Sequence, residues 1–72
     1  MTTFMKLDQS IVANHTTIIV NVNHIRHVTK AYISGTVIVW GNNHSVNVTL
    51  NTDEVFDALR GLPIPGVTLI KA

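Results

Sequence analysis

Cysteine is absent from the 72 residues of this chain. Disulfide bonds and thiolate metal sites, two common ways of stabilising a very small domain, are therefore excluded. A domain of this length buries only a modest share of its surface, so it must rely on its hydrophobic core, on a histidine-bound metal or on other copies of itself. Residues 1–72 are expected to form one domain.

Charge is also scarce. Asp, Glu, Lys and Arg make up 12% of the chain, and apolar residues make up 46%, whereas ordinary globular domains carry about 25% charged residues. A small domain has proportionally more surface and should need more charge. The deficit indicates that uncharged Asn, Thr, Ser and His cover this surface, or that another subunit covers it. We expect a homo-oligomer, with a different protein as the alternative partner.

The sequence has neither the high positive charge expected of a nucleic-acid-binding protein nor the long apolar run expected of a membrane protein. The formal net charge is +1, too small for the electrostatic footprint of a typical nucleic-acid-binding domain. No run reaches the roughly 18 apolar residues that span a bilayer. The N-terminus lacks the basic region and apolar run of a secretion signal. We therefore expect a cytoplasmic protein without a membrane partner.

Val, Ile and Thr are abundant throughout, which favours β-strands. Alternating or continuous apolar runs predict strands near residues 3–8, 16–22, 25–32, 36–40 and 45–50, with Ile11 and Val12 tucked inward from the first connection. Turn signals at Ser34-Gly35 and Gly41-Asn42-Asn43 separate the later strands. The pattern predicts a curled antiparallel β-meander of about five strands.

One helix is expected at residues 52–60. Asn51 followed by Glu54 resembles a capping box, and Gly61 with Pro63 ends the apolar stripe of helical period. Residues 67–70 form a short final strand, pairing at an edge within the chain or on a neighbour. The expected fold class is α+β.

The strand that ends at Trp40 is apolar on both faces, and a single helix covers one face of a sheet. We therefore expect the second face to pack against another subunit. A strongly curled sheet or small barrel that covers both faces alone is the alternative. The predicted interface residues are Ile18, Val37, Ile38, Val39 and Trp40.

No constellation of residues predicts an enzyme. The acids Asp53, Glu54 and Asp57 lie where helix capping explains them, and no nucleophile lies beside a base. His24 and His27 are three residues apart and diverge on a strand, so no metal ligand or cofactor is expected within the chain. Histidines contributed by several subunits remain an alternative.

Nucleic-acid binding is the second functional reading. Tyr32 can stack on a base while Arg26 and Lys30 contact phosphates. The basic residues are nevertheless scattered along the sequence, so nucleic acid is not the expected main partner. The first expectation is a non-catalytic, self-associating binding or regulatory module, and the alternative is a nucleic-acid-binding regulator.

A family resemblance accompanies this reading. The residues Phe4-Met5-Lys6-Leu7 are followed by Ile19-Val20-Asn21-Val22-Asn23-His24-Ile25, Gly35-Thr36-Val37-Ile38-Val39, Val46-Asn47-Val48 and Thr52-Asp53-Glu54-Val55. Over residues 4–60 this order resembles the FlbD-type proteins, short bacterial chains associated with flagellar operons. The resemblance implies strands, a bend and a helix in this sequence, and no catalytic residues.

Overall fold

The computed structural model describes residues 2–71; the predicted domain limits, residues 1 and 72, lie just outside this range. The described residues form six strands, one 3-10 turn and one helix. In chain order these are β1 (Thr3–Leu7), β2 (Ile18–Asn21), η1 (Val22–His24), β3 (Ile25–Lys30), β4 (Thr36–Trp40), β5 (His44–Val48), α1 (Thr52–Leu59) and β6 (Val67–Lys71). The small α+β class expected from the sequence is confirmed.

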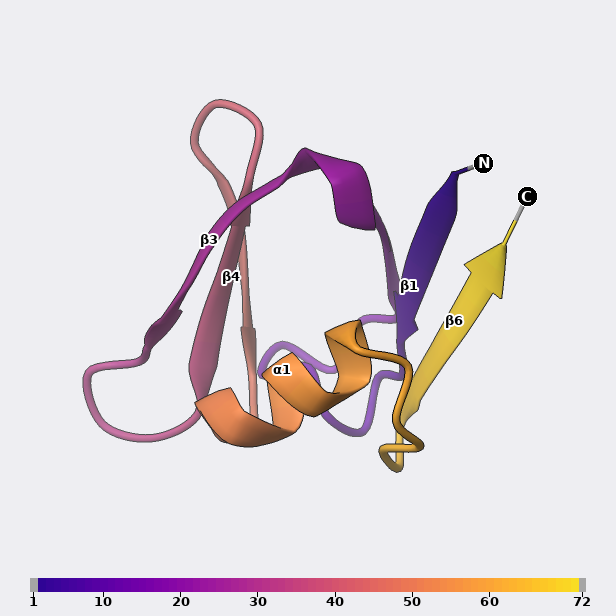
Figure 1. Cartoon of the computed structure of the whole chain (residues 1–72). Coiled ribbons are helices and arrows are strands. Elements are labelled where there is room, and N and C mark those ends of the chain that lie inside the picture. Colours follow the sequence, from indigo (N-terminus) through magenta and orange to yellow (C-terminus); the bar gives the residue numbers. More distant parts are fainter. Residues whose placement is uncertain (1, 72) are drawn as a thin grey trace.

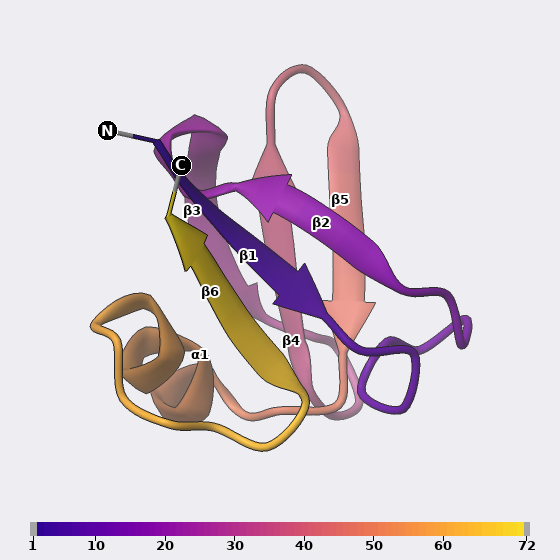
Figure 2. The same ribbon diagram turned by 90° about the vertical axis from the view of Figure 1, so that its right-hand side faces the viewer.

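The strands form two three-stranded antiparallel sheets. Sheet A has the order β2-β1-β6, and sheet B has the order β3-β4-β5. The sheets lean against each other in Figure 1, and in Figure 2 the strands of sheet A run obliquely across those of sheet B. A meander is therefore present only in sheet B, while β6 returns to pair with β1 of the same chain.

The chain passes from sheet A to sheet B through η1. Asn21 ends β2 and caps this turn, because its side-chain oxygen accepts a hydrogen bond of 2.9 Å from the Asn23 backbone N–H. Asparagine makes such local bonds readily and so redirects the backbone. This 3-10 turn divides the strands between the two sheets.

The core lies between the sheets. It contains Met5 and Leu7 of β1, Val20 of β2, Ile38 of β4, and Val46 and Val48 of β5, with Ile11, Val12 and Leu50 from connecting segments. These residues alternate along their strands, so each sheet turns one apolar face to the other. The inner face of each sheet is thus covered within the chain.

The helix closes one end of the space between the sheets (Figure 1). It spans Thr52–Leu59, close to the predicted 52–60, and buries Val55 and Ala58. The predicted capping box is present: the Glu54 N–H donates to the Asn51 side chain at 2.8 Å, and the Asn51 N–H donates to the Glu54 carboxylate at 3.1 Å. No helix in residues 2–71 is long and apolar enough to cross a membrane.

Candidate interaction surfaces

The predicted interface residues separate into two groups. Ile38 is 0% exposed and lies in the core, so its assignment to a subunit interface is corrected. Its side chain faces sheet A, because it is fully buried in the core with residues of both sheets. Ile18 and Trp40 are half-buried and pack against the same core. Val37 and Val39 are half-buried and alternate with Ile38, so they lie on the outer face of sheet B.

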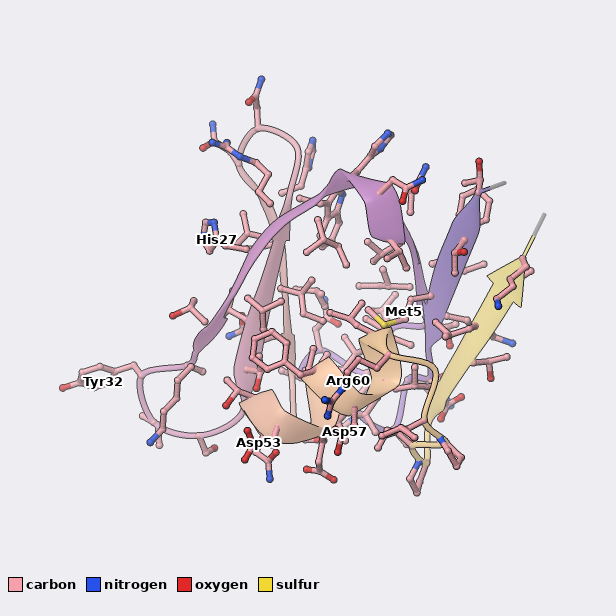
Figure 3. The ribbon with its side chains drawn as sticks, viewed as in Figure 1. Met5, His27, Tyr32, Asp53, Asp57 and Arg60 are labelled. Atoms are coloured by element: carbon pink, nitrogen blue, oxygen red, sulfur yellow. The ribbon has the colours of Figure 1, made fainter. Side chains whose placement is uncertain are left out.

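Polar neighbours frame the two valines on the outer face of sheet B. Val37 lies between Thr29 and Asn47, and Val39 lies between His27 and Ser45. Figure 3 shows His27 on the side of the sheet that faces away from β1 and β6. This face is a narrow apolar strip between polar borders, and the assignment of Val37 and Val39 to an interface stays a prediction.

The outer face of sheet A is more apolar. On β1, Phe4 lies between Asn21 of β2 and Ile70 of β6. Two residues further along β1, on the same face, Lys6 lies between Ile19 and Thr68. Ile19 is 59% exposed and Ile70 is 41% exposed. No other element of residues 2–71 packs on this face (Figure 2). We name Phe4, Ile19 and Ile70 the sheet A patch.

A second apolar feature is the loop that joins β3 to β4. Tyr32 is fully exposed and Ile33 is 87% exposed. Figure 3 shows the Tyr32 side chain extending from this loop away from the body of the molecule. Large apolar side chains at a loop tip contribute nothing to the core, so this loop is available for contact with another molecule.

The residues predicted to contact nucleic acid follow one another along β3 and its loop. Arg26 and Lys30 are exposed on β3, and Tyr32 follows two residues later. The Arg26 guanidinium donates a hydrogen bond of 3.3 Å to the Gly41 carbonyl, which holds it beside the β4–β5 hairpin. Arg60 forms a salt bridge with Asp57 at the end of α1. Strand β3 therefore presents two separate cations, Arg26 beside the hairpin and Lys30 at the strand end, rather than a broad basic surface.

The histidines do not gather within the chain. Among residues 2–71 no three His, Asp or Glu side chains are grouped to hold a metal ion. His44 stacks on Trp40, with ring centroids 6.2 Å apart and an interplanar angle of 18°. This contact gives His44 a packing role at the β4–β5 hairpin.

A groove lies beside β5, where the loop after β1 approaches this strand. Its volume is about 280 Å³, and it is lined by Val12, Ala13, Asn14, Ile18, Ser45, Val46 and Asn47. The loop pairs with β5 through hydrogen bonds from the Ala13 N–H to the Asn47 carbonyl at 2.9 Å and from the Thr49 N–H to the Ile11 carbonyl at 2.7 Å. Every lining residue is uncharged.

One acid stands out electrostatically. Asp8 accepts hydrogen bonds from the Ser10 hydroxyl at 2.6 Å and from the Ser10 N–H at 3.1 Å. These bonds, with the hydroxyl as the larger cause, lower the pKa of Asp8 from its ordinary value of 3.8. The arrangement fixes the turn after β1.

Comparisons with known proteins give no relative: no protein-family model, curated protein or solved structure matches the chain. The likeness to FlbD-type proteins therefore stays a prediction. Function has to be argued from the surfaces described above.

Proposed function

We propose that this protein is a non-catalytic binding or regulatory module that works as a homo-oligomer. The observation that supports this function is the sheet A patch, where Ile19 and Ile70 remain 59% and 41% exposed beside Phe4. We also propose a cytoplasmic location and membership of the FlbD-like group, both on the sequence features given above.

The physical reason is the free energy of covering apolar surface. Full burial of an isoleucine or phenylalanine side chain stabilises a state by about 1.5–3 kcal/mol. Burial of the exposed parts of these side chains between two copies would therefore stabilise an oligomer by several kcal/mol before costs are counted. Part of this gain offsets the entropy lost on binding. Lys6 lies on the same face, and its aliphatic stem can cover neighbouring apolar surface while its ammonium group stays in water.

The solution mass tests this proposal. Light scattering coupled to size exclusion is expected to give a multiple of 7.9 kDa across a dilution series. Ile19→Lys should shift the equilibrium toward the monomer, since it adds a charge to the patch. Thr29→Lys is the matched control, because it adds the same charge on the exposed outer face of sheet B. A wild-type monomer at micromolar concentration would contradict the proposal.

A nucleic-acid-binding regulator is the second candidate. Three exposed residues on β3 and the following loop favour it: Arg26, Lys30 and Tyr32. Two phosphate contacts predict weak, salt-dependent binding, and Tyr32 offers one stacking surface for an unpaired base. Fluorescence anisotropy with a labelled single strand, at two salt concentrations, distinguishes this candidate. Binding that is lost in Arg26→Ala/Lys30→Ala and kept in Ile19→Lys would support it.

A further inference from the structure

The loop that joins β3 to β4 presents its two large apolar side chains on a fixed base. Tyr32 and Ile33, at the tip, are almost fully exposed. The base is closed by a hydrogen bond of 3.1 Å from the Ala31 N–H to the Gly35 carbonyl. Gly35 also lies against the end of β5, where an added Cβ atom would be 2.2 Å from the Val48 carbonyl oxygen. A tip held by such a base loses less conformational entropy on contact with another molecule than a loosely attached one.

This tip and the sheet A patch lie at opposite ends of the molecule. In the shared view of Figures 1 and 3, Tyr32 extends from the end that is farthest from β1 and β6. The two apolar features therefore do not cover each other within one copy. Each remains exposed to water until another molecule packs on it.

Lys6 determines how two copies meet at the patch. The outward-facing strand residues of sheet A are Phe4, Lys6, Ile19, Asn21, Thr68 and Ile70. Lys6 is the charged residue among them, and it lies on the central strand. Two copies that packed patch against patch would bring both Lys6 ammonium groups onto one small face, where like charges repel. An aromatic ring over Lys6 attracts the ammonium group instead, through the negative face of its π-system.

We propose that the Tyr32-Ile33 tip of one copy docks on the sheet A patch of the next copy. The Tyr32 ring would lie over Lys6, and Ile33 would pack on the exposed isoleucines of the patch. This contact rests on the proposed self-association and names the two surfaces that make it. Because the tip meets a different surface, the contact is head-to-tail, and each copy both offers a tip and receives one. Repetition of the contact closes into a ring or continues as an open chain of copies.

Two complementary variants test the contact. Tyr32→Ser/Ile33→Ser removes the tip and keeps the patch, whereas Ile19→Lys disrupts the patch and keeps the tip. Each variant alone should be a monomer by light scattering coupled to size exclusion, across the dilution series in which the wild type is associated. An equimolar mixture should contain a heterodimer, because one intact tip and one intact patch make a single contact. Native mass spectrometry distinguishes this heterodimer from either homodimer by its mass.

Leu62→Ser is the matched control for the tip. Leu62 is half exposed in the connection between α1 and β6, so this variant loses exposed apolar surface outside both proposed surfaces and should keep the wild-type mass. Tyr32→Phe keeps the aromatic ring and should associate as the wild type does. Since Tyr32 and Ile33 are exposed, their replacement should leave the circular dichroism spectrum and the unfolding midpoint unchanged.

Lys6→Gln gives a second readout, with opposite signs for the two arrangements. With a tyrosine ring over Lys6, loss of the ammonium group should raise the dissociation constant about two- to fivefold, the range of an exposed cation–π contact. In a patch-against-patch contact the same change removes like-charge repulsion, so the dissociation constant should fall. A fall would therefore overturn the tip-to-patch contact.

The outcomes separate this contact from the proposed function. Loss of association in Ile19→Lys, with an unchanged wild-type mass in Tyr32→Ser/Ile33→Ser, would show self-association through the patch without the tip. A mixture of the two variants without a heterodimer would also overturn the tip-to-patch contact. A wild-type monomer at micromolar concentration would overturn both proposals.

Discussion

Trp40 and His44 stack across the hairpin that joins β4 to β5, with their ring centroids 6.2 Å apart. The two residues are also directly paired in the strand register. The contact therefore holds the end of the hairpin.

Removal of this stack should destabilise the fold modestly. We expect His44→Ala to lower the free energy of unfolding by about 0.5–1.5 kcal/mol, which is typical of an aromatic pair beyond its buried area. The single tryptophan of the chain reports the change through its fluorescence during urea unfolding. His27→Ala is the control, because His27 is exposed on β3. An equal effect of both variants would mean that the stack contributes nothing.

Neighbouring residues of β4 should differ sharply in their contribution to stability. Ile38 is fully buried, and Val39 lies half-buried on the outer face. Ile38→Ala should therefore cost about 3–4 kcal/mol, because it removes apolar contacts and leaves a cavity. Val39→Ala should cost about 1 kcal/mol or less. Urea unfolding of both variants measures the difference, and similar midpoints would contradict the placement of Ile38 in the core.

The local pattern of the sequence was sufficient for individual elements. The alternation of Val46, Val48 and Leu50 predicts an inward face, and all three are buried. The Asn51 and Glu54 pair predicts the helix start, and both capping bonds are present. These features depend on contacts between residues close in sequence, so the sequence determines them locally.

The arrangement of the strands could not be predicted in the same way. The apolar run at residues 37–40 predicts that both faces of β4 are at least partly buried. It does not identify the element that packs on each face. Sheet A covers the inner face of β4 with the buried residues of β1 and β2. Strand β6 completes that sheet by pairing with β1, about sixty residues earlier in the chain. The sheet A patch depends on this same long-range register, which brings Ile70 beside Phe4. The sequence pattern contains no signal for that pairing.

Gly35 should be the glycine least tolerant of substitution. Its φ is 86°, and a Cβ atom there would lie 2.2 Å from the Val48 carbonyl oxygen. Gly61 has a similar φ of 90° with no atom within 4 Å of the added Cβ. Gly61→Ala should therefore cost about 1–2 kcal/mol for the left-handed backbone alone. Gly35→Ala should lower the free energy of unfolding further, because the added Cβ also clashes with the Val48 carbonyl oxygen.

Thermal unfolding of the two alanine variants separates these effects. Since a change of 1 kcal/mol shifts Tm by roughly 4–8 °C in a domain of this size, the difference between the variants is measurable. Equal shifts would show that the backbone near Val48 moves freely to accommodate a side chain. Such an outcome would contradict the tight approach of the β3–β4 turn to the end of β5.

Asp8 should make stability depend on pH in acid. Its pKa is lowered in the folded state, mainly by the Ser10 hydroxyl. The ionised Asp8 carboxylate therefore stabilises the folded state, and this contribution to stability is fully present above pH 3.8, the ordinary pKa. That contribution is lost as the pH falls through the lower folded value, because the unfolded chain binds the proton more readily. Ser10→Ala removes the larger hydrogen bond and should raise the pKa of Asp8 toward its ordinary value. An NMR titration of the Asp8 carboxyl carbon measures the shift, with Ser34→Ala as a control in a distant turn. An unchanged pKa in Ser10→Ala would mean that the hydroxyl does not hold the carboxylate, and the turn after β1 would then depend on its backbone bonds alone.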